Sequence, residues 1–153
     1  MKSYTATALG IARKIWIITV LINTIAYTIL ISIVSGDSAE VFFLIALLIA
    51  LLGGMFSAPI FLVIWGMLYG FLIRGRNAPY ILKWLLIAGT GMAIVAWVVF
   101  AKSFHFLDSE ILRLMIVAAL SGAVAVYAGY SNIKNACLAG EGEKALMESF
   151  HRM

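Results

Sequence analysis

The sequence predicts an all-α, polytopic membrane protein built as a bundle of four transmembrane helices. Hydrophobic residues make up 64% of the 153 residues and charged residues only 12%, whereas a soluble domain is about half apolar and about a quarter charged. The apolar residues gather in long segments without the polar–apolar alternation that a membrane β-barrel needs. These segments are 15–34, 41–73, 80–101 and 111–131.

Three of the four segments have the length of an ordinary transmembrane helix, which needs about 20 residues to cross a hydrocarbon core roughly 30 Å thick. The first segment, 15–34, follows the basic residues Lys2, Arg13 and Lys14, as a signal peptide would. The apolar part of a signal peptide is about 7–15 residues long. We therefore expect this segment to be a retained transmembrane helix.

Segment 41–73 contains no charged residue and is too long for one perpendicular crossing. It is interrupted by Gly53, Gly54 and Pro59. Proline removes a helical hydrogen bond and crowds the preceding turn, so we expect one long helix with a kink near Pro59. Two interpretations stay open. The kink shapes the helix around its neighbours, or the broken backbone lines a site, with Ser57 as its polar side chain.

The loops predict an orientation. Arg74 and Arg76 follow the second segment, and further basic residues lie near both termini, whereas Asp37 and Glu40 precede it. The positive-inside rule then places both termini in the cytoplasm, and the topology suits a bacterial inner membrane. Aromatic residues near the predicted cytoplasmic boundary fit an interfacial belt. They are Trp16, Tyr80, Trp84, Tyr127 and Tyr130.

The chain divides into a transmembrane domain, residues 1–133, and a short cytoplasmic tail, residues 134–153. The tail is polar and contains two glycines, Gly140 and Gly142, each followed by glutamate. Glycine disfavours helix. We therefore expect a turn at residues 140–143, followed by a short helix.

The first segment carries the most polar helix face. The polar residues of this face recur at the spacing that puts residues on one side of a helix. They are Thr19, Asn23, Thr24, Tyr27, Thr28 and Ser32. Lipid offers these groups no hydrogen-bond partner. They either bond between helices or form one wall of a solute path, with Asn23 as its most polar member.

Small residues form a second pattern, which lets helix backbones approach closely in lipid. Gly66 and Gly70 form a G-x-x-x-G motif in the second segment. The fourth segment carries a small face made of Ser121, Gly122, Ala125 and Gly129. These residues either assemble the bundle itself or provide a seam for a partner or a second copy of the chain.

Ionisable residues are absent from the middle of all four segments. Proton relays, ion-coupled transporters and voltage sensors usually carry such residues, so the sequence argues against all three. No catalytic, phosphate-binding or metal-binding motif is present, and we expect no cofactor, no metal and no nucleic acid partner.

The leading hypothesis is a non-enzymatic protein that binds a membrane protein partner through helix–helix contacts in the lipid bilayer. Such a protein could be an accessory subunit or an immunity-type inhibitor. The alternative is a transporter or channel for a small neutral solute, formed either by one chain or by an oligomer. An enzyme acting on lipid has the least support, because the sequence shows no recognisable set of catalytic residues.

Overall fold

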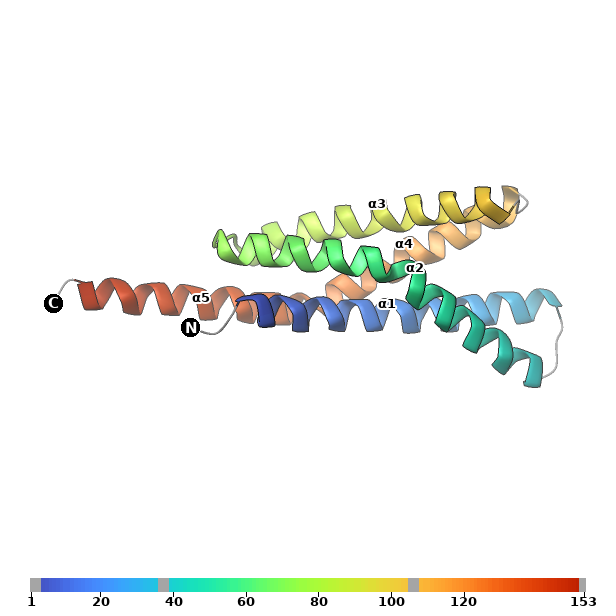
Figure 1. Cartoon of the computed structure of the whole chain (residues 1–153), viewed down its shortest axis with the longest axis horizontal. Helices are drawn as coiled ribbons and strands as arrows, with labels where there is room; N and C mark the ends of the chain where they lie inside the picture. The colour runs from blue at the N-terminus through green and yellow to red at the C-terminus, as the bar shows by residue number, and fades with distance from the viewer. Residues whose placement is uncertain (1–3, 36–38, 105–107, 152–153) are drawn as a thin grey trace.

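The computed structural model describes residues 4–35, 39–104 and 108–151, and every element in these ranges is an α-helix. The all-α prediction is therefore confirmed for the described residues. Figure 1 shows the five helices. They are α1 (Tyr4–Ser35), α2 (Ala39–Ile73), α3 (Ala78–Phe104), α4 (Asp108–Ala128) and α5 (Tyr130–His151).

The helices α1 to α4 alternate in direction in an elongated bundle, and α5 continues in the direction of α4 (Figure 1). The start of α1, the α2–α3 turn and α5 lie toward one end, and the start of α4 and the end of α1 lie toward the other. α1 contacts mainly α2 and α4, and α3 contacts mainly α4. We call the end with the α2–α3 turn the basic end. Its exposed cations are Arg13, Lys14, Arg74, Arg76, Lys83 and Lys134.

Three helical stretches of the described chain are long and apolar enough to span a membrane: Tyr4–Ile29, Ala78–Val95 and Met115–Gly142. The third runs across the junction between α4 and α5. In α2, the stretches Ala46–Met55 and Ser57–Ile73 meet at 48°. They reach the length and apolarity of a span only when taken together.

The helices extend farther than the apolar segments alone predict. α1 begins at Tyr4, and α5 continues through Gly140 and Gly142 without a turn. The expected turn at residues 140–143 is therefore wrong. Gly140 lies against α1, where an added Cβ would come within 3.3 Å of the Tyr4 hydroxyl oxygen. The helix therefore continues through two glycines, although each costs about 1 kcal/mol in helix propensity.

The buried core lies toward the basic end, and all five helices contribute to it. Its smallest members are alanines of α1, α3 and α4, which allow these helices to approach closely. Its members are Ala8, Ile11, Ala12, Ile15, Ile64, Leu68, Leu72, Ala78, Ile81, Leu85, Ala125, Val126 and Ile133. The described side chains on the outward surfaces are mostly apolar as well, and lipid accepts such surfaces without cost.

Among the described glycines, Gly129, between α4 and α5, leaves the least room for a side chain. A Cβ added there would lie 2.8 Å from Ile15 Cγ1 and 3.3 Å from the Val126 carbonyl oxygen. Ile15 is fully buried, and the clash is with its Cγ1 atom and not with the end of a flexible side chain. Glycine is therefore required at this position for α1 to lie against the α4–α5 junction.

Replacing Gly129 with alanine is expected to lower the free energy of unfolding by about 1–3 kcal/mol, the usual cost of overpacking a core. The measurement is chemical denaturation in detergent micelles, followed by circular dichroism. Gly122→Ala is the matched control, because an added Cβ there meets no atom within 4 Å.

Making Gly129→Ala in a protein that already carries Ile15→Ala tests whether the clash with Ile15 causes the loss of stability. The cost of Gly129→Ala should shrink in this background, because the opposing side chain is then gone. Equal costs in both backgrounds would contradict the steric explanation.

Candidate functional site

A hydrogen bond between side chains joins α1 to α2 at the bend. The Trp16 indole Nε1–H donates to Ser57 Oγ at 2.8 Å, and the Ser57 hydroxyl donates to the Gly54 carbonyl oxygen at 3.2 Å. The Trp16 ring also lies against Phe61, with ring centroids 5.9 Å apart. Ser57, the polar side chain of the predicted break, thus bonds within the chain and holds α1 at this point.

The predicted polar face of α1 directs its described hydroxyl bonds back to its own backbone. Thr19 Oγ1 donates to the Ile15 carbonyl oxygen at 2.9 Å, and Thr28 Oγ1 donates to the Thr24 carbonyl oxygen at 2.6 Å. Tyr27 and Thr28 are both buried. Such bonds to the preceding turn satisfy a hydroxyl without help from water.

Asn23 is the exception on this face. Its Oδ1 atom is buried and has no hydrogen-bond partner. The same is true of the Nε1 atom of Trp65 on α2. A buried polar atom without a partner costs about 1–3 kcal/mol. Asn23 is therefore the member of the face that has most to gain from a bound water, solute or polar side chain. The side chain of Ser32 lies outside the described part of the chain.

The small face of α4 divides into buried and accessible positions. Ser121, Ala125 and Gly129 are buried inside the bundle, and Ser121 Oγ donates to the Val117 carbonyl oxygen at 2.7 Å. Gly122 is partly exposed, and a Cβ there would meet no atom within 4 Å. This row therefore helps to assemble the bundle, and Gly122 lies at its edge.

The G-x-x-x-G motif of α2 lies differently. An added Cβ at Gly66 or Gly70 would meet no atom within 4 Å. Beside them, Leu62, Tyr69 and Ile73 are exposed by 57%, 38% and 51%. We call the surface made by these five residues the Gly66–Gly70 face. No described residue of another helix lies within 4 Å of the Cβ positions of its two glycines.

The predicted break carries no polar side chain beyond Ser57. Gly53 and Pro59 are exposed and Gly54 is partly exposed, and an added Cβ at either glycine would meet no atom within 4 Å. The glycines are thus not required by close packing among the described residues.

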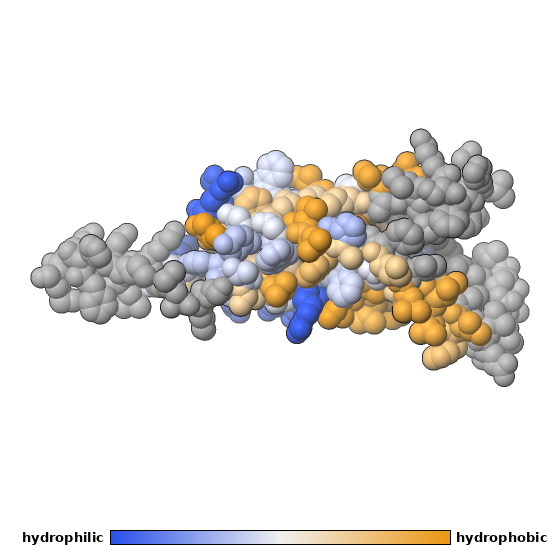
Figure 2. Space-filling view, in the orientation of Figure 1, coloured by the Kyte–Doolittle hydropathy of each residue, from blue (hydrophilic) through white to orange (hydrophobic). Residues whose placement is uncertain are grey.

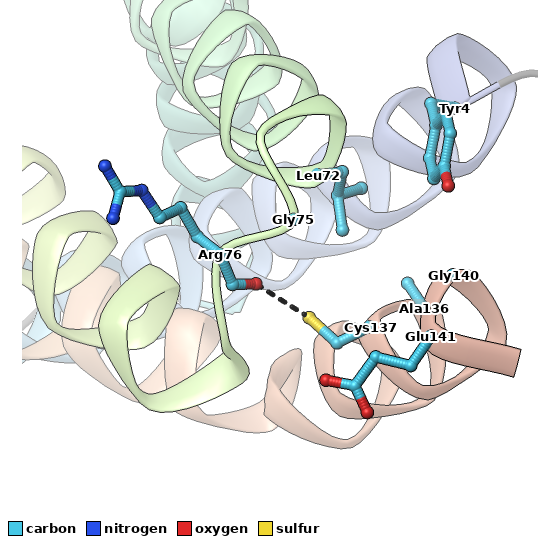
Figure 3. A pocket seen from close by; sticks show the side chains of 8 residues that line it. All are labelled: Tyr4, Leu72, Gly75, Arg76, Ala136, Cys137, Gly140 and Glu141. Carbon is cyan, nitrogen blue, oxygen red and sulfur yellow. Dashed lines mark hydrogen bonds between the residues drawn. The ribbon is translucent and has the colours of Figure 1, made fainter. Parts of the chain in front are cut away.

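A small cavity of about 30 Å³ lies at the basic end, between the start of α1, the α2–α3 turn and α5 (Figure 3). The Cys137 thiol points toward the turn and donates to the Arg76 carbonyl oxygen, with an Sγ–O distance of 3.5 Å. A water needs about 10–15 Å³ of such volume, so the cavity has room for one or two waters. Its lining residues are Tyr4, Leu72, Gly75, Arg76, Ala136, Cys137, Gly140 and Glu141.

The described residues contain no group of three or more histidine, cysteine, aspartate or glutamate side chains that could hold a metal ion. The accessible features of the site are therefore helix faces and single polar groups. No protein-family model matches the sequence, and comparison with curated proteins and with solved structures found no similar protein.

The bond between Trp16 and Ser57 can be tested by a double-mutant cycle. Trp16→Phe keeps a ring and removes the donor, and Ser57→Ala removes the acceptor. The two changes should show a coupling energy of about 0.6–1.7 kcal/mol, the average and maximum for hydrogen bonds between membrane helices. Chemical denaturation in micelles measures it.

Thr28→Val serves as the control for this cycle, because the Thr28 hydroxyl bonds within α1. Its effect should add to that of Trp16→Phe within about 0.5 kcal/mol. Additive effects of Trp16→Phe and Ser57→Ala would show that the bond does not contribute to stability.

Proposed function

We propose that this chain is a non-enzymatic integral membrane protein that acts by binding a protein partner inside the bilayer. In this proposal α2 forms the fourth span, with its stretches Ala46–Met55 and Ser57–Ile73 acting as one bent crossing. Pro59 accounts for the bend, since it cannot donate to the Met55 carbonyl and crowds it. The basic end faces the cytoplasm of a bacterial cell, as the positive-inside rule predicts.

The observation that carries the proposal is the contrast between Gly129 and the two glycines of α2. Gly129 is in contact with Ile15, so its small size is used inside the chain. A Cβ added at Gly66 or Gly70 would meet no atom within 4 Å, so no described contact of this chain requires their small size. A second helix that lay against this face would gain close backbone contact, which is how helices associate in lipid.

The chemistry of the described surface fits a binding role. The Gly66–Gly70 face offers the Tyr69 ring and hydroxyl beside two glycines, with the exposed side chains of Leu62 and Ile73 at its two ends. Such a face distinguishes partners by shape and by one polar group. An accessory subunit of a larger membrane complex, or an inhibitor that blocks a membrane-inserting toxin, needs only a surface of this kind.

The first test is native mass spectrometry of the full-length protein extracted from its own membrane in a mild detergent. We expect a foreign membrane protein to be present at a fixed stoichiometry. Gly66→Leu and Gly70→Leu should each remove at least nine-tenths of it, because the larger side chains keep the partner helix from approaching the backbone of α2.

Gly91→Leu is the matched control for the two variants. It adds the same side chain to an exposed position of α3 where a Cβ meets no atom within 4 Å, and it should leave the complex intact. A partner retained by both α2 variants would contradict the proposal. A second copy of the chain in place of the foreign protein would replace the accessory role with self-association through the same face.

A second candidate function, transport of a small neutral solute by an oligomer, is favoured by one observation. The Asn23 Oδ1 atom is buried without a partner in the span Tyr4–Ile29, where a water or solute hydroxyl could satisfy it. The described hydroxyls of Thr19 and Thr28 bond within α1. They would therefore support such a path only weakly.

Asn23→Leu separates the two functions. If the chain binds a protein partner, this change removes an unsatisfied polar atom and should raise the free energy of unfolding by about 1 kcal/mol. Permeation of glycerol or urea into proteoliposomes, followed by stopped-flow light scattering, should stay at the rate of the wild type. Permeation above that of empty liposomes, abolished by Asn23→Leu but not by Gly91→Leu, would favour the transporter instead.

A further inference from the structure

We propose that the corner between α2 and α3 binds the phosphate of an anionic phospholipid. The site is made of the Arg76 guanidinium, the Lys83 ammonium and the aromatic rings of Tyr80 and Trp84. Tyr80 lies between the two cations in the sequence, and Trp84 directly follows Lys83. This inference concerns a different surface from the Gly66–Gly70 face and does not require a protein partner.

Two contacts establish which parts of the antiparallel helices lie at the same level. Gly129 at the α4–α5 junction lies against Ile15 of α1. An added Cβ on Gly89 of α3 would lie 3.9 Å from Val126 Cγ2 of α4. Residues can be counted outward from these contacts along each helix, since neighbouring helices rise by the same amount per residue.

The count places cations of three helices at one level. Arg13 lies two residues before Ile15 and is therefore level with residue 131, and Lys83 lies six residues before Gly89 and is level with residue 132. Lys134 of α5 lies two residues beyond the position that is level with Lys83. Arg13, Lys83 and Lys134 are all exposed, and Figure 2 shows strongly hydrophilic patches at the basic end and over the first half of α1.

Beyond this level the exposed residues of the same helices become apolar. They include Ile17, Leu21, Ile25, Ile87, Ile116, Leu120 and Val124. About 20 residues farther along, the length of one crossing, α1 ends at Ser35 and α3 ends at Phe104. In this proposal the level of Arg13 and Lys83 lies at the boundary of the hydrocarbon, near the lipid phosphates, and the parts of Tyr4–Ile29 and Ala78–Val95 that precede these residues lie outside it.

The corner itself is held in a defined shape. The Arg76 guanidinium carbon lies 5.1 Å from the centroid of the Tyr80 ring, which makes a cation–π contact. The Tyr80 ring contacts Phe71 edge-on at 5.6 Å and Trp84 at 6.2 Å. Tyr80, Lys83 and Trp84 share one face of α3 because they are three and four residues apart.

The backbone fixes this arrangement. Gly75 has a φ of 62°, which glycine adopts without strain, and it turns the chain sharply after α2. Asn77 Oδ1 accepts a hydrogen bond of 3.1 Å from the Tyr80 amide, which caps the start of α3. The Arg76 guanidinium is thus placed over the Tyr80 ring at a sharp turn, and Lys83 follows on the same face of α3 as Tyr80.

The charge of the corner is not balanced by the described chain. At the basic end, Glu141 is the one acidic residue whose side chain the structure describes. It lies on α5, and Figure 3 shows the Arg76 side chain pointing away from it and out of the cavity. Two cations within about one helical turn of the proposed phosphate level, since the Arg76 guanidinium lies over the Tyr80 ring, match an anionic headgroup in charge, and the partly exposed tyrosine and tryptophan rings beside them match it in polarity.

The test is native mass spectrometry of the full-length protein in a mild detergent, titrated with dioleoyl phosphatidylglycerol or dioleoyl phosphatidylcholine. We expect tighter binding of the first phosphatidylglycerol than of phosphatidylcholine. Arg76→Gln and Lys83→Gln should each weaken it about fivefold, which corresponds to about 1 kcal/mol per basic residue near a charged membrane surface. Glycerol 3-phosphate should not displace the lipid.

Lys134→Gln is the matched control, because it removes one exposed positive charge from the same end, and it should weaken binding less than twofold. Tyr80→Leu should weaken binding with no change in net charge, because it removes the ring that orients Arg76. Equal losses in Arg76→Gln, Lys83→Gln and Lys134→Gln would show general attraction to the basic end and overturn the site, as would no loss in any variant.

Discussion

The contact between Ile15 and Gly129 is the constraint on which the bundle depends. It brings α1 into van der Waals contact with the backbone at the α4–α5 junction, and α1 is the helix that also contacts α2. Since the hydrophobic effect does not drive helices together in lipid, the assembly relies on such steric fits. The buried core surrounds this contact, and every helix contributes a side chain to it.

Much of the helical architecture could be predicted from the sequence, because a bilayer permits few alternatives. Apolar runs of the right length in a chain without period-two alternation predict helices. The helix ends were harder to predict. α1 begins at Tyr4 and α5 passes through Gly140, and these two residues lie side by side in the structure although they are far apart in the sequence. Such a contact between distant residues leaves no local signal.

The residues of the candidate surfaces could be identified from the sequence, whereas what each surface contacts could not. Ser121, Ala125 and Gly129 have the same small-residue pattern as Gly66 and Gly70, yet the first set is buried and the second lies open. Trp16 looks like an interfacial residue in the sequence, whereas its indole bonds to Ser57 on the next helix. Spacing identifies a helix face, and only the packing decides what that face contacts.

The position of the core has a consequence for how the molecule would respond to bilayers of different thickness. The described core lies at the basic end, whereas the stretch Ala46–Met55 of α2 diverges from the axis of Ser57–Ile73 by 48°. Hydrophobic mismatch is relieved by tilting a helix. A change in tilt of Ala46–Met55 would adjust the hydrophobic length, while Gly66 and Gly70, beyond the bend, would keep their place relative to the core.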